Sequence, residues 1–357
     1  MLAWRVVQHG RPTDALRLDE IETPEPGAGE LLVRNSATVL NYNEVDGCRG
    51  RYLTVNPPLP YTLGMELVGI VEAAGPGLDA WLGRRVVSTA VGAFGAHAEA
   101  ALVSADMTFD APACLDDIHA AAFFFPFHLA SLGLFLRGRL SAGQTVLVHA
   151  GAGGVGSAAV QLAAAAGARV IATAGGPEKV ARCLEFGAAF AIDYRDVDFV
   201  DAVRDATNGV GVDLVFDGVG GEVGERSLRC VAHNGLYLIV GFASGIEAEE
   251  IATVAPRSLC FGNFSMGGVM LSYSSHASAV RAATGFNITP RRTADELHAR
   301  LVGLLDDGAI APVVGEVVAF SELPVALERM EQRATIGRVV VDLARPAAIS
   351  DPGLRPA

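Results

Sequence analysis

The stretch that decides the fold is TVLVHA at residues 145–150, followed by the loop Gly151-Ala152-Gly153-Gly154-Val155-Gly156. An apolar strand, a G-x-G-x-x-G loop and an Ala-rich helix over Val155–Ala166 are typical of a dinucleotide-binding βαβ unit. Such glycines permit a tight turn, and the helix directs its first N–H groups at a pyrophosphate. The alternative is a Gly-rich turn used only for packing. We therefore expect the loop residues Gly151, Gly153, Gly154, Val155 and Gly156 to bind a dinucleotide cofactor.

The alternation of strand and helix continues after this loop. Apolar runs predict further strands at Ala168–Ala174, Ala189–Tyr194, Val212–Gly218 and Gly235–Gly241. Helices are expected between them, over Pro177–Phe186, Asp198–Thr207 and Glu222–Ala232. Strands separated by helices of this length indicate an α/β fold with a parallel, doubly wound sheet and right-handed crossovers.

The flanking parts of the chain have a different pattern. Strands are expected at Leu31–Val39, Leu67–Val71 and Arg85–Ser88, with Gly and Pro between them. Towards the C-terminus the pattern predicts helices at Thr293–Asp306 and Leu323–Gln332 and strands at Val313–Phe320 and Gly337–Leu343. A chain of 357 residues also suggests two domains. We therefore expect a β-rich domain beside the doubly wound one.

Composition excludes several classes of function. The 27 Lys and Arg residues against 40 Asp and Glu give a formal net charge of −13, which argues against nucleic acid as a partner. The apolar run Ala120–Leu136 is short for a membrane span of about 20 residues, so we expect a buried helix and no membrane partner. Five scattered cysteines and no signal-peptide layout at the N-terminus fit a reducing cytoplasm.

The turn after the second strand of the βαβ unit bears on the choice of cofactor. Sites that prefer NAD place an Asp or Glu there to bind the ribose 2′-OH. Here the turn Thr173–Gly176 holds no acid, and Gly175 leaves room for a 2′-phosphate. Lys179, Tyr194 and Arg195 follow as donors, although Lys179 is also explained as a solvated lysine. The electrostatics favour NADPH over NADH.

Motifs in the N-terminal part carry a family resemblance. They are N-Y-N-E at residues 41–44, G-R-Y at 50–52 and P-Y-T-L-G-M-E-L-V-G-I-V at 60–71. With the glycine loop, they resemble the zinc-free medium-chain dehydrogenase/reductases, particularly the NADPH:quinone oxidoreductase branch. The resemblance implies a β-rich, chaperonin-10-like catalytic domain built from residues 1–124 and 272–357. It implies a central Rossmann NADPH-binding domain over residues 125–271.

The resemblance also implies positions near the nicotinamide. They are Asn41, Phe242, Ala243, Asn263 and Phe264. It further implies that the stretch Phe261–Leu271 forms an edge strand that pairs across a two-fold axis. An exposed apolar edge would otherwise favour aggregation, so we expect a homodimer.

The same comparison argues against zinc. Zinc dehydrogenases of this superfamily carry a histidine ligand where this chain has Met65, and the segment Asn41–Asp46 lacks their ligand cysteine. A catalytic zinc needs three N, O or S protein ligands. We therefore expect no metal and no Lewis-acid chemistry from one.

Without a metal, the acceptor must already be electrophilic, as quinones and α,β-unsaturated carbonyls are. In related enoyl reductases a tyrosine at the G-x-Y position is the acid, so Tyr52 is the first catalytic candidate. The alternative is that Tyr52 only lines the pocket while solvent supplies the proton. Asn41 is the second candidate, because its amide can donate to a ribose hydroxyl, a carboxamide or a substrate carbonyl. The alternative for Asn41 is an ordinary Asn turn.

Two other functions stay open. An enoyl-thioester reductase would need basic residues at the mouth of its site, for which the candidates are Arg49, Arg51, Arg291 and Arg292. A non-catalytic, crystallin-like NADPH-binding protein needs the cofactor site alone. Both alternatives share the predicted fold and cofactor with the quinone or enone reductase.

Overall fold

A computed structural model of the chain describes residues 1–51, 57–244 and 254–345. The chain divides into two compact units, each with its own core. The first consists of Met1–Ala122 and Val314–Ala357, and the second consists of Phe123–Val313.

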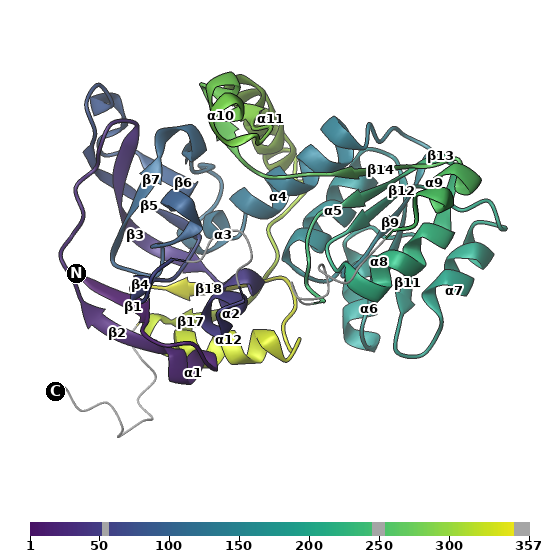
Figure 1. Cartoon of the computed structure of the whole chain (residues 1–357), viewed down its shortest axis with the longest axis horizontal. Helices are drawn as coiled ribbons and strands as arrows, with labels where there is room; N and C mark the ends of the chain where they lie inside the picture. Colours follow the sequence, from purple (N-terminus) through teal and green to yellow (C-terminus); the bar gives the residue numbers. More distant parts are fainter. Residues whose placement is uncertain (52–56, 245–253, 346–357) are drawn as a thin grey trace. The chain divides into compact units, whose positions relative to one another are not determined.

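The strands of the first unit pair antiparallel, except for one parallel pair between Val314–Ala319 and Arg338–Asp342 (Figure 1). Its larger sheet has the order β17-β18-β3-β5-β6-β8, and β7 also pairs with β3. These strands are β3 (Glu30–Val39), β5 (Glu66–Ala74), β6 (Arg85–Thr89), β7 (Ala100–Ser104), β8 (Phe109–Asp110), β17 (Val314–Ala319) and β18 (Arg338–Asp342). A smaller sheet has the order β2-β1-β4, from Leu16–Glu20, Leu2–Val6 and Tyr61–Thr62. Both ends of the chain therefore build this unit, as predicted.

The joining of the two ends is visible in the register of one pair of strands. Val340 of β18 lies opposite Val39 of β3 in an antiparallel ladder. The register of β3 with β5 shifts at two points, and Gly69 of β5 lies beside one of them. A Cβ on Gly69 would lie 2.0 Å from the carbonyl oxygen of Arg34, so only glycine allows this approach. Below the sheet, helix α12 (Leu323–Glu331) packs against α2 (Tyr42–Arg49).

The second unit contains a six-stranded parallel sheet with the order β11-β10-β9-β12-β13-β14. In chain order the strands are β9 (Thr145–Val148), β10 (Arg169–Ala174), β11 (Phe190–Asp193), β12 (Val212–Asp217), β13 (Val231–Ile239) and β14 (Ser265–Gly268). This is the 3-2-1-4-5-6 order of a Rossmann fold, which reverses between β9 and β12. The predicted α/β doubly wound fold is confirmed.

Helices cover both faces of this sheet. On one face, α5 (Gly154–Ala165) and α6 (Pro177–Glu185) meet beside Gly151, where a Cβ would touch Ala172, Cys183 and Val160. On the other face, α7 (Phe199–Ala206) packs Phe199, Val200 and Val203 onto Leu147, Ile171 and Val215. The apolar strands are thus covered on both sides, which explains their near-continuous hydrophobicity.

One predicted helix is too long. The helix expected over Glu222–Ala232 is α8 (Gly221–Ser227), followed by a single 3₁₀ turn at Leu228–Cys230. Strand β13 already begins at Val231, because Val231 pairs with Val212 of β12. The strand expected at Gly235–Gly241 therefore starts four residues earlier, and the pairing of Val231 outweighs the helical pattern.

The apolar run near residue 120 forms consecutive helical segments. These are α3 (Asp117–Ala121) in the first unit, then α4 (Phe124–Ser131) and a π-helical turn η4 (Leu132–Arg137) in the second. By length and composition Asp117–Arg137 could span a membrane, but 78% of its most apolar window is buried inside the protein. The side chains of Phe123, Phe124 and Phe127 are fully buried core residues. A core helix therefore explains the run.

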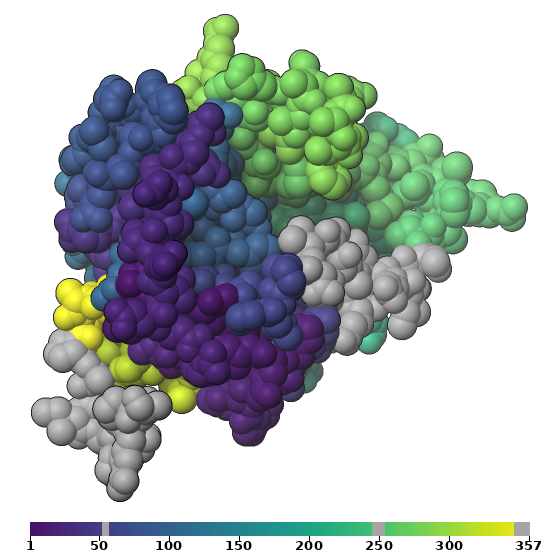
Figure 2. Space-filling view, turned by 60° about the vertical axis from the view of Figure 1, so that its left-hand side comes forward, coloured from purple at the N-terminus to yellow at the C-terminus, as the bar shows by residue number. Residues whose placement is uncertain are grey.

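The boundary between the units differs from the expected one. Residues 272–313 were expected in the catalytic domain, yet the structure groups them with the Rossmann sheet. This segment contains β15 (Tyr273–Ser274), α10 (Ala277–Thr284), β16 (Thr289–Pro290) and α11 (Arg291–Asp306). Specific hydrogen bonds attach this segment to the second unit, because Tyr273 and His298 both hydrogen-bond to His128 of α4. The outer side of α10 and α11 is an exposed surface, green in Figure 2.

Candidate functional site

The glycine loop joins β9 to α5 at the carboxyl edge of the sheet. The N–H of Gly151 donates to the Thr173 carbonyl oxygen at 2.9 Å, which ties the loop to the end of β10. A Cβ on Gly156 would lie 2.1 Å from the Ala150 carbonyl oxygen, so α5 can start this close to the loop only with glycine. Gly153 caps α5, and Gly154 and Val155 open its first turn. The first N–H groups of a helix lack partners within it, which makes this turn suited to a phosphate.

The turn after β10 meets the end of β11. A Cβ on Gly175 would lie 2.6 Å from the Tyr194 hydroxyl and 3.0 Å from Nε of Arg195. Gly176 has a φ of 96° and caps α6, whose first turn carries Lys179. The structure therefore brings Tyr194 and Arg195 together at the turn of residues 173–176, with Lys179 three residues beyond Gly176.

One carboxylate at this turn was missed by the sequence reasoning. Asp193, the last residue of β11, accepts the N–H of Arg195 at 3.0 Å. Backbone hydrogen bonds from Gly176 and Arg195 lower the pKa of Asp193. Its position before a turn was the available signal, because Asp commonly accepts backbone N–H groups two residues on. Asp193 fixes the two turns against each other.

A buried histidine braces the start of the glycine loop. His149 follows β9 directly, and its ring nitrogens lie 2.9 Å from Oγ1 of Thr173 and 2.7 Å from Oγ of Ser227. The Ser227 hydroxyl donates to the Val223 carbonyl oxygen, so it accepts from Nε2–H of His149. Burial lowers the pKa of His149 and keeps the ring neutral. His149 thus links β9, β10 and α8 beneath the loop.

Asp217, at the end of β12, is a structural residue. One carboxylate oxygen accepts the N–H groups of Val219 and Gly220 at 2.7 and 3.1 Å. The other accepts the Tyr237 hydroxyl at 2.6 Å. Asp217 therefore caps the turn that leads into α8.

The residues expected near the nicotinamide divide into two groups. Phe242 and Ala243 follow β13, and the Ala243 N–H donates to the Gly218 carbonyl oxygen at the carboxyl edge. Asn263 and Phe264 directly precede β14, which runs parallel to β13. They therefore lie at the amino edge of the sheet, opposite the glycine loop. The expectation that Asn263 and Phe264 lie near the nicotinamide is therefore wrong. The expectation overlooked that residues entering and leaving a parallel strand lie at opposite edges of the sheet.

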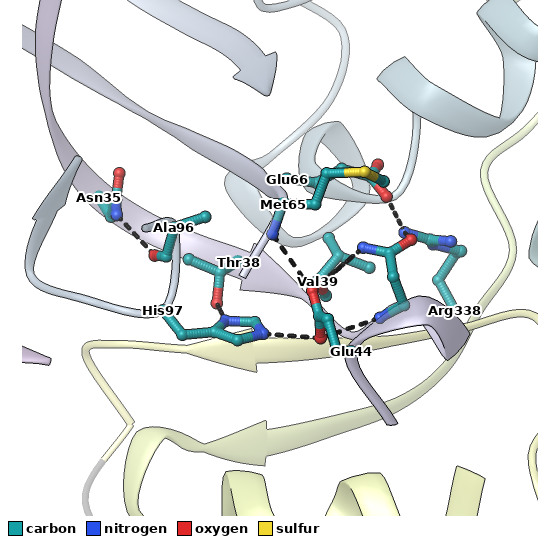
Figure 3. Close-up of polar contacts among 10 residues, drawn as sticks. Asn35, Thr38, Val39, Glu44, Met65, Glu66, Ala96, His97 and Arg338 are labelled. Atoms are coloured by element: carbon teal, nitrogen blue, oxygen red, sulfur yellow. Dashed lines mark hydrogen bonds and ion pairs between the residues drawn. The ribbon is translucent and has the colours of Figure 1, made fainter. Parts of the chain in front are cut away.

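The first unit holds a buried polar network that includes Glu44, His97 and Arg338 (Figure 3). Asn41 is buried and belongs to this network. It caps helix α2, and its N–H donates to Oε2 of Glu44 at 3.1 Å. Its side-chain amide donates to the Val39 carbonyl oxygen at 3.2 Å and accepts from Arg338 at 3.1 Å. The structure therefore gives Asn41 a capping role, and contact with a cofactor stays a prediction.

His97 and Met65 meet the same network through Glu44. The ring of His97 lies 2.9 Å from Oγ1 of Thr38 on one side and 2.9 Å from Oε2 of Glu44 on the other. The Met65 N–H donates to Oε1 of Glu44 at 3.2 Å. Both ring nitrogens of His97 are thus occupied by protein groups. Within the described residues, no group of three or more His, Cys, Asp or Glu side chains is arranged to hold a metal.

A buried ion pair closes the network. Arg338 of β18 binds the Glu66 carboxylate, and both side chains are less than a tenth exposed. Burial raises the pKa of Glu66, and the positive charge of Arg338 opposes that rise. Removing one partner would leave a buried charge unpaired, which costs about 3–5 kcal/mol. The pair connects the two terminal segments of the chain.

The other candidate residues of the first unit lie at the end of α2. Gly50 caps the helix with a φ of 71°, and Tyr52 lies outside the described residues. Arg49 forms two hydrogen bonds with Glu331, at 3.1 and 2.8 Å. Of the other arginines considered for a thioester site, Arg51 pairs with Asp46, Arg291 with Asp295 and Arg292 with Glu296. These arginines thus serve local ion pairs.

Comparison with known proteins agrees with this architecture. Residues 27–113 match the family described as the alcohol dehydrogenase GroES-like domain, and residues 154–284 match the zinc-binding dehydrogenase family. The chain is 30% identical to a 2-haloacrylate reductase from a Burkholderia species, over 90% of this chain and 93% of that protein. It is 31% identical to the quinone oxidoreductase of Rattus norvegicus, over 73% and 79% of the two chains.

Longer relatives and solved structures extend the comparison. The chain is 29% identical to part of the phenolphthiocerol/phthiocerol polyketide synthase of Mycobacterium tuberculosis and spans 15% of the length of that much larger polypeptide. The Escherichia coli quinone oxidoreductase complexed with NADPH superposes with a TM-score of 0.84 at 29% identity, covering 96% of this chain and 100% of that one. A mycobacterial protein complexed with NADPH gives 0.83 at 32% identity, covering 96% and 99%.

A Rossmann unit with a glycine loop, joined to a GroES-like unit built from both termini, defines a two-domain oxidoreductase of the dehydrogenase type. More narrowly, the chain belongs to the medium-chain dehydrogenase/reductase superfamily, in its quinone oxidoreductase-like branch.

Proposed function

We propose that this protein is an NADPH-dependent reductase that transfers hydride to a quinone or an α,β-unsaturated carbonyl without zinc. The observation that carries the proposal is the approach of Tyr194 and Arg195 to Gly175. Residues 173–176 of this turn carry no acid, and the carboxylate of Asp193 beside it already accepts the backbone N–H groups of Gly176 and Arg195. Donors at this turn match a 2′-phosphate, and no carboxylate from β10 repels it. Two of the related structures are complexes with NADPH, which supports the same cofactor here.

The glycine loop fits the pyrophosphate of such a cofactor. Side chains at Gly151 and Gly156 would clash with Ala172 and with the Ala150 carbonyl oxygen, so the loop keeps a narrow backbone cradle. The first turn of α5 would hold the phosphates, and Lys179, Tyr194 and Arg195 would hold the 2′-phosphate. When bound, NADPH supplies the hydride from C4 of its nicotinamide.

We propose that the protein uses no zinc because of the side chains present where related dehydrogenases carry zinc ligands. Met65 offers a thioether and lies buried beside Glu66, and His97 uses both ring nitrogens within the protein. A thioether in place of an imidazole removes one ligand that Zn²⁺ would need. The acceptor must then be electrophilic without help from a metal. The related 2-haloacrylate reductase is named for such a conjugated substrate.

The protein must then stabilise the charge that develops on the acceptor. Tyr52 would donate a hydrogen bond to the carbonyl oxygen as negative charge builds there. Asn41 would orient the nicotinamide end through its amide, in addition to capping α2. If Tyr52 only lines the pocket, solvent supplies the proton instead. We also propose that the protein acts in the reducing cytoplasm, where the buried thiols of Cys48, Cys183 and Cys230 would stay reduced.

Two alternatives keep the same cofactor site. An enoyl-thioester reductase is less favoured, because each of its candidate arginines forms an ion pair with a carboxylate of the protein; these are Arg49, Arg51, Arg291 and Arg292. A non-catalytic NADPH-binding protein would explain the turn at Gly175 but needs no acceptor. The test is NADPH oxidation with 9,10-phenanthrenequinone, with crotonyl-CoA and without an acceptor. Oxidation with the quinone supports the proposal, oxidation with crotonyl-CoA alone favours the thioester reductase, and none favours the binding protein.

A further inference from the structure

Three buried or half-buried side chains form a continuous hydrogen-bonded chain in the Rossmann-type unit. The hydroxyl of Tyr273 lies 2.9 Å from Nδ1 of His128, and Nε2 of His128 lies 3.0 Å from Nδ1 of His298. Tyr273 and His128 are buried, and His298 on α11 is half-buried. This hydrogen-bonded chain of side chains therefore leads from a half-buried residue, His298, to the buried phenol of Tyr273.

The packing of α4 and η4 shows where these three hydrogen-bonded side chains lie relative to the sheet. A Cβ on Gly133 would touch Phe216 and Leu238, which are the last residues but one of β12 and β13. A Cβ on Gly138 would touch Leu214, nearer the start of β12. The helical segment thus runs antiparallel to the strands. His128 lies five residues before Gly133, so it lies beyond the carboxyl ends of β12 and β13.

Tyr273 approaches from the same edge. It follows the end of β14 by five residues, and Arg137 of η4 donates to the carbonyl oxygen of Gly268 at that end. In a Rossmann sheet the first three strands bind one mononucleotide half and the last three bind the other. The glycine loop and the Gly175 turn lie on β9 and β10, so β12, β13 and β14 serve the nicotinamide half. The histidine–tyrosine chain therefore lies on the side of the hydride donor.

The surroundings favour the neutral forms of His128 and Tyr273. Burial lowers the pKa of His128 well below its usual range, and the charges of His298 and Arg291 act in the same direction. Burial raises the pKa of Tyr273, which Arg291 opposes. Arg291 is itself paired with Asp295 at 2.8 Å. A neutral His128 carries one ring proton, on Nδ1 or on Nε2. The hydrogen-bonded chain of Tyr273, His128 and His298 can therefore donate in either of two directions.

We propose that Tyr273, His128 and His298 form a proton-transfer chain that delivers a solvent proton to the reduced acceptor. The inference rests on the proposed reductase function and assigns the source of the proton that accompanies the hydride. It would complement Tyr52, which would stabilise the developing oxyanion.

The transfer balances as a single proton. In one direction of donation, His298 donates to His128, His128 donates to Tyr273, and Tyr273 donates its own proton. When the phenol O–H bond breaks, the acceptor anion takes that proton. The Tyr273 oxygen then takes the Nδ1 proton of His128, whose Nε2 takes the Nδ1 proton of His298. Nε2 of His298 takes a proton from water, which leaves hydroxide in the solvent, and no electron moves along the hydrogen-bonded chain.

The test compares the wild type with Y273F and H298Q in D₂O, with NADPH and 2-methylcyclohex-2-enone. The wild type should place deuterium at the α-carbon of the product in one configuration. Y273F should lose about 100-fold in kcat, the lower range for a positioned acid, and should give both configurations. H298Q should lose about tenfold in kcat with the enone and with 9,10-phenanthrenequinone, and imidazole in the buffer should restore its rate.

The control is E296Q, on the exposed side of the same helix, where Glu296 pairs with Arg292. E296Q should match the wild type, and all three variants should keep the wild-type affinity for NADPH. Suppose that the wild type is active, that the Y273F product still has one configuration and that imidazole does not raise the rate of H298Q. This result would overturn the proton-transfer chain and leave the proposed reductase function standing. If the wild type reduces only the quinone, the test is the rate of H298Q with the quinone. Recovery of that rate with imidazole supports the proton-transfer chain, and no recovery overturns it. A wild type that reduces neither acceptor overturns the proposed function and the chain with it.

Discussion

In the Rossmann-type unit, Gly175 and Tyr194 lie so close that a Cβ at residue 175 would come within 2.6 Å of the phenol oxygen. Gly175 follows the second strand of the sheet and Tyr194 follows the third. The glycine therefore lets the hydroxyl lie against the turn where a dinucleotide places its ribose. This contact is the structural basis of the proposed preference for NADPH.

We expect Gly175→Ala to weaken NADPH binding about two- to tenfold, because the added methyl would displace the Tyr194 hydroxyl and one hydrogen bond contributes about 0.5–1.5 kcal/mol. NADH binding should change little. The matched control is Gly303→Ala on α11, where a Cβ meets nothing within 4 Å. Fluorescence titration with both cofactors measures the effect. An unchanged NADPH affinity in Gly175→Ala would remove Tyr194 from the cofactor site.

Lys179→Ala should weaken NADPH binding by about 1.5–3 kcal/mol, the cost of losing a charge-assisted contact, and should leave NADH binding unchanged. The control is Arg182→Ala, which removes the same charge from the next turn of α6, where Arg182 pairs with Glu185. The two cofactors are titrated against both variants. Equal affinity of the parent for NADPH and NADH would contradict the preference itself.

Tyr52→Phe should separate two kinds of acceptor. Reduction of an enone builds charge on a carbonyl oxygen, which a positioned phenol can stabilise, so the rate should fall about 10²-fold or more. A quinone gives a more stable anion that depends less on a hydrogen bond from Tyr52, so its rate should fall little. Steady-state rates with both acceptors test this. Equal, minor losses would show that Tyr52 only lines the pocket, and equal, severe losses with weaker NADPH binding would assign it to the cofactor site.

The protein should self-associate, most simply as a dimer, through the edge of the Rossmann sheet. Strand β14 is the last strand of that sheet, and the neighbouring side chain of Met270 is 48% exposed. Met270→Lys should then yield a monomer, since a charge opposes pairing along an edge. The control is Phe286→Lys, at an exposed apolar side chain elsewhere in the same unit. Light scattering at micromolar concentration that reports a monomeric wild type would contradict the proposal.

Much of the Rossmann unit could be predicted from sequence because its signals are local. The glycine loop and the alternation of apolar strands with helices fix the element order, and the observed strands differ from the predicted ones by a few residues. The exception is Val231, which pairs with Val212 although the local pattern is helical. A long-range pairing of this kind has no signal within a window of sequence.

The candidate site was predictable only in part, for the same reason. The contact of Gly175 with Tyr194 follows from adjacent parallel strands, whereas Asn263 and Phe264 were placed at the wrong edge of the sheet. The network of Glu44, His97 and Arg338 joins segments up to 297 residues apart, and the pairing of Tyr273 with His128 joins residues 145 apart. Single polar residues in apolar surroundings do not reveal such partners. The sequence around His128 and His97 therefore gives no sign of the residues to which they hydrogen-bond.

The most direct test of the proposed function is the rate of NADPH oxidation with 9,10-phenanthrenequinone after the protein has been dialysed against a metal chelator. We predict a quinone-dependent rate equal to that before dialysis, and a lower rate when NADH replaces NADPH at the same concentration. Loss of the rate on chelation with recovery on adding zinc would contradict a zinc-free, NADPH-dependent reductase, as would an equal rate with NADH.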